Sequence, residues 1–255
     1  MRILYILFAA MLVSGPHQAH AQQGQELTVA AALSLKGAFE EAGARYQGGR
    51  PGERILFNFA ASGVLQRQIE GGAPADVFAS ASPREMDDLE RKQMLAAGSR
   101  RTFARNAIVL IVPAGGKSFA ASFPGLREGN VRRIAIGNPA TVPAGTYAEE
   151  VLRHFNVLGS LRGRFVFAEN VRQVIDYVSR GEVDAGIVFA TDAIGVPGIA
   201  VAATAPSESH APAVYHIAVV RGAKHEAAAR AFIDLLLSGD GQEVLKRRGF
   251  LPAAP

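Results

Sequence analysis

Segments typical of strands and segments typical of helices alternate along almost the whole chain, and this alternation constrains the fold more than any other feature. Residues 54–60 alternate apolar and polar side chains as a strand does, and residues 64–70 then show helical spacing up to Gly71. The same signals predict strands at 27–31, 54–60, 76–79, 107–112, 133–137, 165–167, 185–189, 199–203 and 215–220, and helices at 35–46, 64–70, 83–94, 145–155, 171–180, 224–237 and 240–248. Such alternation predicts an α/β fold with helices covering parallel or mixed sheets.

The N-terminus has the pattern of a secretory signal peptide. Arg2 precedes an apolar run at residues 3–13, which is too short for a membrane-spanning helix of about 20 residues. Ala19 and Ala21 then supply the small residues that a signal peptidase reads. The pattern predicts a signal peptide at residues 1–21, cleavage after Ala21, and export to the periplasm.

The remaining chain is long enough for two domains of ordinary size. A second set of alternating strands and helices begins after Arg105. Two such sets predict two α/β lobes with a ligand cleft between them. In open α/β sheets, ligands bind beyond the carboxyl ends of the strands, so the turns from strand to helix are the candidate binding segments.

Four of these turns are similar in chemistry: residues 31–36, 59–64, 141–146 and 168–172. Each places small or capping residues at the start of a helix, where free backbone N–H groups and the helix dipole favour an anion. The hydroxyl groups of Ser34 and Ser62 add donors. The alternative for each serine is an ordinary helix cap.

The sequence lacks the residues that several other classes of function require. The chain has no cysteine, which excludes disulfides, thiolate metal sites, a cysteine nucleophile and a lipid anchor on cysteine. The sequence contains no GxSxG, P-loop or HExxH motif, and its histidines are dispersed, so an enzyme is not predicted. Basic pairs are scattered rather than clustered, which argues against a nucleic-acid partner.

Six segments carry a resemblance to a known family: AAALSLKGAF (30–39), FAASGVLQRQIEGGAPADVFASA (59–81), GNPATVPAGTYA (137–148), ENVR (169–172), GIVFATDA (186–193) and GFLP (249–252). With them, nearly all of the sequence after residue 21 resembles the periplasmic molybdate-binding proteins of ABC transporters. The resemblance implies a type II periplasmic-binding fold, in which two α/β lobes are joined by two crossing segments. Lobe one would comprise residues 22–104 and 216–255, lobe two residues 105–215, and the crossings would fall near 105–106 and 214–215.

The resemblance also implies the ligand contacts. These are the hydroxyls of Ser34 and Ser62, the backbone amides of Ala144 and Val171, and the residue at position 189. In the family this last residue is commonly a tyrosine whose hydroxyl donates to the oxyanion, whereas this chain has Phe189. The missing donor could be replaced by Thr146, Thr191 or a water molecule.

The implied ligand is molybdate, with tungstate close enough in shape to bind as well; another tetrahedral oxyanion such as sulfate or phosphate is the alternative. The metal would be held through its oxygen atoms, without direct bonds from the protein and without a cofactor. Molybdate carries no proton at neutral pH, whereas phosphate does and needs an acceptor. The two serine turns contain no carboxylate, and Glu169 near the fourth turn is predicted to face solvent or the other lobe. The implied partner is the membrane permease of an ABC transporter, served by a monomer.

Overall fold

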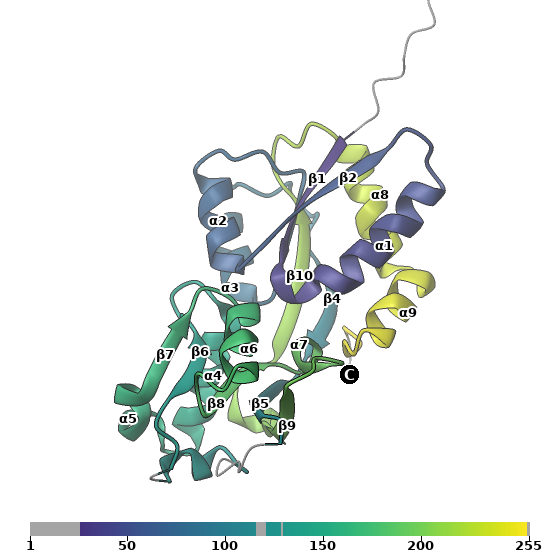
Figure 1. The fold of residues 1–255 in the computed structure, drawn as a ribbon. Helices are drawn as coiled ribbons and strands as arrows, with labels where there is room; N and C mark the ends of the chain where they lie inside the picture. Colours follow the sequence, from purple (N-terminus) through teal and green to yellow (C-terminus); the bar gives the residue numbers. More distant parts are fainter. Residues whose placement is uncertain (1–25, 116–120, 129, 254–255) are drawn as a thin grey trace, which may run out of the picture.

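The computed structural model describes residues 26–115, 121–128 and 130–253, so the predicted signal peptide at 1–21 lies outside the described residues. Two five-stranded sheets, each with helices packed on it, form two lobes placed end to end (Figure 1). This arrangement confirms the prediction of two α/β lobes. Every helix in the described ranges is too short or too polar to cross a membrane.

The sheet of the first lobe has helices on both faces. Its strands lie in the order β2 (Arg54–Ala60), β1 (Glu26–Ala32), β3 (Val77–Ser80), β10 (Ala213–Val219) and β4 (Arg101–Asn106). β1 is parallel to β2 and β3, whereas β10 is antiparallel to β3 and β4. The helices are α1 (Lys36–Gly48), α2 (Ser62–Glu70), α3 (Pro83–Arg91), α8 (Glu226–Leu237) and α9 (Gly239–Arg247).

Strand β1 shows why both faces are covered. Successive side chains of a strand point to opposite faces, and here both sets are buried. Val29 joins the core cluster that includes Phe39 of α1 and Phe232 of α8, while Ala30 joins a second cluster with Leu65 of α2. The apolar run at residues 29–32 of β1 is therefore buried between two helix layers.

The sheet of the second lobe has the same pattern of parallel and antiparallel strands as the first. Its strands lie in the order β7 (Phe165–Ala168), β6 (Ile134–Gly137), β8 (Ala185–Phe189), β5 (Ile108–Pro113) and β9 (Ile199–Thr204). β6 is parallel to β7 and β8, and β5 is antiparallel to β8 and β9. The helices are α4 (Pro143–His154), α5 (Leu158–Leu161), α6 (Val171–Ser179) and α7 (Ala190–Ala193), with short 3-10 turns at η2 (Pro124–Arg127), η3 (Arg162–Arg164) and η4 (Ser207–Ser209). One further 3-10 turn, η1 (Leu33–Leu35), lies in the first lobe between β1 and α1.

Two strands of the first sheet carry the chain to and from the second lobe. β4 ends at Asn106, and β5 of the other sheet begins two residues later at Ile108. The chain returns after β9 and enters β10 at Ala213, which pairs with Asn106. The crossings predicted near 105–106 and 214–215 therefore fall at the end of β4 and the start of β10. By sheet membership, the passages between the sheets are Ala107 and residues 205–212.

Candidate anion-binding site

A small cavity lies where the two lobes meet. Twelve residues line it: Ala32, Leu33, Ser34, Ala60, Ala61, Ser62 and Ala81 from the first lobe, and Val142, Pro143, Asn170, Val171 and Phe189 from the second. Of the described residues that line the cavity, every one is neutral. Its volume of about 10 Å³ holds roughly one water-sized group. A tetrahedral oxyanion is larger than one water molecule.

Four of the five predicted contact residues line this cavity: Ser34, Ser62, Val171 and Phe189. The fifth, Ala144, directly follows the lining residue Pro143 and is fully buried. Val171 is the first residue of α6, and Ala144 is the second residue of α4. A backbone N–H at either position has no carbonyl partner within its own helix, so it can donate to a ligand.

Neither serine acts as a helix cap. The N-cap residues are Ala32 for η1, Leu35 for α1 and Ala61 for α2, and none of them makes a side-chain capping bond. The Ser62 hydroxyl oxygen instead accepts a hydrogen bond from the Ala81 N–H at 3.1 Å. The Ser34 hydroxyl lies 2.9 Å from the Tyr215 hydroxyl. The capping alternative is therefore wrong, and these hydroxyls remain suited to a ligand.

Phe189 supplies an apolar wall to the cavity and no hydrogen-bond donor. Its ring is 1% exposed and packs against Tyr215, with 5.6 Å between ring centroids. Thr146 and Thr191, the two residues suggested as replacement donors, are not among the described lining residues. The Thr146 hydroxyl donates to the Pro139 carbonyl at 3.1 Å, and the Thr191 hydroxyl accepts from Asn106 at 2.8 Å. Glu169 is exposed and also lies outside the lining.

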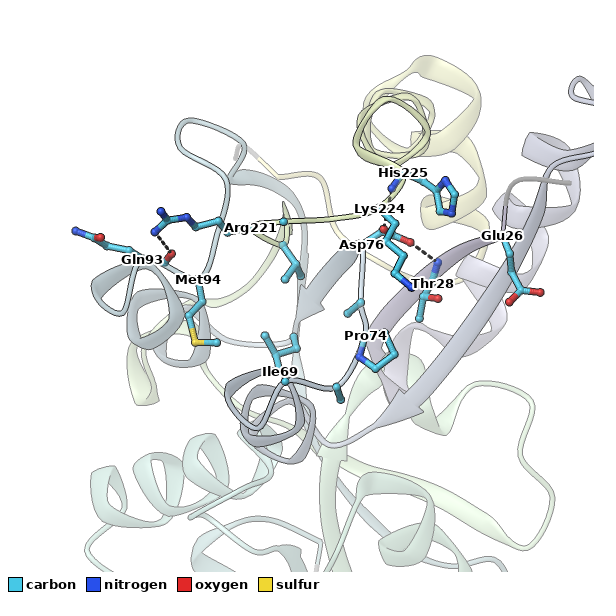
Figure 2. A pocket seen from close by; sticks show the side chains of 15 residues that line it. Glu26, Thr28, Ile69, Pro74, Asp76, Gln93, Met94, Arg221, Lys224 and His225 are labelled. Carbon is cyan, nitrogen blue, oxygen red and sulfur yellow. Dashed lines mark hydrogen bonds between the residues drawn. The ribbon is translucent and has the colours of Figure 1, made fainter. Parts of the chain in front are cut away.

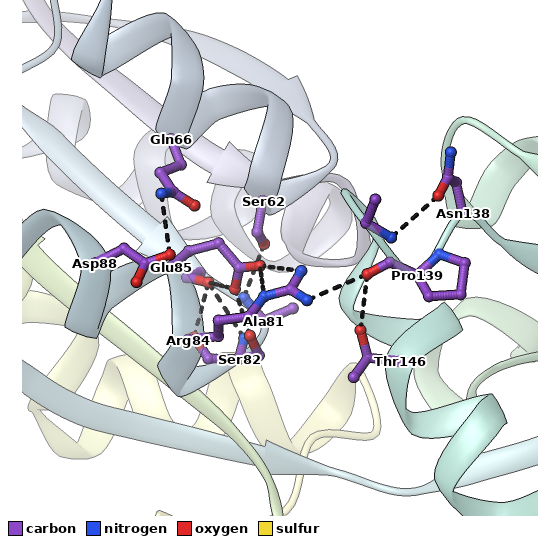
Figure 3. A network of polar contacts seen from close by, with 12 residues as sticks. Ser62, Gln66, Ala81, Ser82, Arg84, Glu85, Asp88, Asn138, Pro139 and Thr146 are labelled. Carbon is purple, nitrogen blue, oxygen red and sulfur yellow. Dashed lines mark hydrogen bonds and ion pairs between the residues drawn. The ribbon is translucent and has the colours of Figure 1, made fainter.

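Polar contacts join the lobes beside the cavity. Figure 3 shows Arg84 between Glu85 of its own lobe and Pro139 of the other. The Arg84 guanidinium donates to the buried Glu85 carboxylate at 2.8 and 3.0 Å and to the Pro139 carbonyl at 3.2 Å. The Gly63 N–H donates to the Thr141 carbonyl at 3.0 Å. The Gly63–Thr141 bond holds the second and third predicted turns against each other, and the Arg84–Pro139 bond is a second contact between the lobes. Sequence spacing alone did not reveal either bond.

A larger cavity of about 730 Å³ lies beside the opposite ends of β1 and β3 and contains none of the predicted contact residues (Figure 2). The buried Asp76 carboxylate at this cavity accepts from the N–H groups of Thr28 at 2.8 Å and His225 at 3.1 Å. Asp76 thus ties β1 to the start of α8, which is a structural role.

Asp192 is a titratable group near the site that the sequence did not single out. Its Oδ2 atom is buried and has no hydrogen-bond partner in the described part of the chain. Burial raises the pKa of this carboxyl to about 7, and a backbone hydrogen bond from Phe189 and the charge of Arg172 oppose the rise only in part. Together with Ser34 and Val171, Asp192 lines a neighbouring cavity of about 480 Å³.

The raised pKa predicts a pH-dependent stability that Asp192→Asn removes. Because the folded-state pKa exceeds the unfolded value of about 3.9, folding favours the protonated carboxyl. The contribution of this carboxyl to the free energy of unfolding is complete below about pH 4 and is lost as the pH rises through about 7. Because Asp192 as a whole residue is only half-buried, solvent screens part of this effect, and the expected loss in the free energy of unfolding is about 1–2 kcal/mol. Urea unfolding at pH 5 and pH 8 should show a smaller pH difference in the variant; equal pH differences in both proteins would contradict the expectation.

Comparisons with known proteins show what the chain as a whole is similar to. The Molybdate-binding protein ModA of Escherichia coli (strain K12) is 36% identical over 248 residues, covering 95% of each chain. That of Haemophilus influenzae is 34% identical over 256 residues, covering 98% of this chain and 99% of the relative. The solved Azotobacter vinelandii periplasmic molybdate-binding protein shares the fold, with a TM-score of 0.79, 24% identity, and coverage of 88% of this chain and 98% of that one.

The resemblance stated from the sequence is thereby confirmed, and so is the type II periplasmic-binding fold. Residues 27–251 match the family described as bacterial extracellular solute-binding protein. Its members are components of transport systems rather than enzymes, which confirms that prediction as well. The chain belongs to the family of bacterial extracellular solute-binding proteins.

Proposed function

We propose that this chain captures molybdate in the periplasm and delivers it to an ABC importer. One observation carries the proposal: two serine hydroxyls and helix N-termini from both lobes converge on a cavity with a neutral lining. Backbone N–H groups at helix starts and side-chain hydroxyls can donate hydrogen bonds to an anion, so no charged side chain is needed. The relatives in Escherichia coli and Haemophilus influenzae are named for molybdate binding, which supports this ligand.

The chemistry of the lining favours a fully ionised oxyanion. The described lining residues include no carboxylate that could accept the proton of hydrogen phosphate. Molybdate and tungstate are dianions of nearly the same shape, and both would be held through their oxygen atoms, with no cofactor required. The Asp192 carboxyl lines the neighbouring cavity instead.

A ligand panel tests the proposal. Thermal unfolding and calorimetry with molybdate, tungstate, sulfate, phosphate and chromate should show stabilisation and the tightest binding with the first two, because ligands that bind only the folded state stabilise it. Tighter binding of sulfate or phosphate would assign the site to a different oxyanion. A chain that binds none of the five would overturn the proposal.

Contacts from both lobes give the proposed delivery mechanism. An oxyanion that touches Ser34 and Ser62 in the first lobe and Val171 in the second favours the closed arrangement by its differential affinity. The membrane permease would then recognise the closed monomer. Export through the predicted signal peptide at residues 1–21 would place the protein in the periplasm.

Restoring the tyrosine at position 189 is expected to tighten molybdate binding. Phe189→Tyr adds one donor to the apolar wall, and a hydrogen bond to a charged group contributes about 1–2 kcal/mol here, or roughly fivefold to thirtyfold in affinity. Phe167→Tyr makes the same chemical change on an exposed face and serves as the control. Titration calorimetry measures both. Unchanged or weaker binding in Phe189→Tyr would mean that the cavity is already complete around phenylalanine.

A further inference from the structure

A chain of hydrogen bonds runs from the first crossing segment to Ser34. The Ala107 N–H donates to Asn106 Oδ1 at 2.9 Å. Asn106 Nδ2 donates to the Tyr215 hydroxyl oxygen at 3.2 Å and to the Thr191 hydroxyl oxygen at 2.8 Å. The Tyr215 hydroxyl lies 2.9 Å from Ser34 Oγ. These contacts link the end of β4, strand β10 and the first serine turn.

The chemistry of the groups fixes the direction of this chain. A backbone N–H only donates, so the atom of Asn106 that it contacts is the carbonyl oxygen and the other terminal atom is the amide nitrogen. That nitrogen is a donor, and the Tyr215 oxygen therefore accepts from it. The hydrogen of the Tyr215 hydroxyl is then left for Ser34 Oγ. Ser34 accepts, and its own hydroxyl hydrogen is free to point into the cavity.

The opposite direction is unfavourable. If Ser34 donated to Tyr215, the tyrosine hydrogen would lose its only acceptor among the described residues while the side chain is fully buried. An unpaired buried donor is costly. Burial also raises the pKa of Tyr215 well above its ordinary value, so the phenol keeps its hydrogen.

We propose that Tyr215 and Asn106 are positioning residues that turn the Ser34 hydroxyl hydrogen toward the bound oxyanion. The inference rests on the proposed function, because it requires Ser34 to donate to the ligand. A hydroxyl held in the bound orientation loses less rotational freedom on binding than a free one, so the two residues raise affinity without touching the ligand. Ser62 obtains the same orientation from a simpler source, the Ala81 N–H.

Tyr215→Phe tests the proposal, since it keeps the ring that packs against Phe103, Phe189 and Phe250 and removes only the hydroxyl. Molybdate affinity is expected to fall about fivefold to twentyfold. A purely structural role would weaken binding in any background. The orienting role acts through one serine, so Tyr215→Phe should add almost nothing to Ser34→Ala and its full effect to Ser62→Ala.

The outcomes separate the two proposals. If Ser34→Ala does not weaken molybdate binding, the contact assigned to Ser34 is wrong. If Ser34→Ala weakens binding but Tyr215→Phe does not, or if Tyr215→Phe has the same effect with Ser34 absent, the positioning role is overturned while the function stands. Asn106→Ala is the second variant should Tyr215→Phe unfold, and its loss of affinity must likewise disappear in the Ser34→Ala background.

Discussion

Gly145→Ala is expected to destabilise the protein by about 2–4 kcal/mol, because the added methyl group has no space. A Cβ atom at this position would lie 1.9 Å from the Gly137 carbonyl oxygen and 2.6 Å from its carbon. Both are backbone atoms of β6 that no side-chain rotation can move aside. Helix α4 would have to shift away from the sheet, and with it Pro143 of the cavity wall and the neighbouring Ala144.

Urea unfolding measures this loss, with Gly159→Ala as the matched control. Gly159 lies in the short helix α5, and a Cβ atom added there would meet no atom within 4 Å, so the change should be neutral or slightly stabilising. Molybdate affinity should also fall in Gly145→Ala and not in the control. Similar unfolding free energies for the two variants would show that α4 can move without cost.

Most strands could be predicted because a strand that is buried on both faces appears in the sequence as an apolar run. β4 escaped prediction: residues 101–106 contain two arginines and a threonine, and only Phe103 and Ala104 form an apolar pair. This strand forms through pairing with β10, more than 100 residues away, and Arg105 also bridges to Leu251. Such long-range pairing overrides a weak local pattern.

The candidate site was predictable to the extent that its chemistry resides in local turns. The four turns are short segments with recognisable helix starts. The Tyr215 hydroxyl is different, because it meets Ser34 across 181 positions of sequence and leaves no spacing to read. Asp192 was equally hidden, since nothing in its neighbours indicates that its carboxyl oxygen is buried without a partner.

Capping and ligand binding by serine could not be separated from sequence, because both place a hydroxyl at a helix start. The structure distinguishes the two roles because the N-cap of α2 is the residue before the serine. Ala61 is the N-cap of α2, so Ser62 is already inside the helix and its hydroxyl oxygen is engaged by the Ala81 N–H of the neighbouring segment. The hydroxyl hydrogen therefore remains for a ligand.

Ser34→Ala and Ser62→Ala are each expected to weaken molybdate binding about tenfold to a hundredfold, since a hydrogen bond to a charged group contributes roughly 1.5–3 kcal/mol. Ser62→Ala also leaves the buried Ala81 N–H without its partner, and Ser34→Ala leaves the Tyr215 hydroxyl without its acceptor. Each variant should therefore lose about 1 kcal/mol of folding stability as well.

Calorimetry beside melting curves separates these two effects, and Ser160→Ala is the control because that hydroxyl bonds only locally, to the Val157 carbonyl at 2.9 Å. The control should keep its molybdate affinity. If the two site variants lose stability but keep their affinity, the serines are structural and the oxyanion is held by helix amides alone. If both lose affinity while their melting temperatures without ligand change little, the hydroxyls act on the ligand directly, because a folding defect of about 1 kcal/mol leaves nearly all of the protein folded and able to bind.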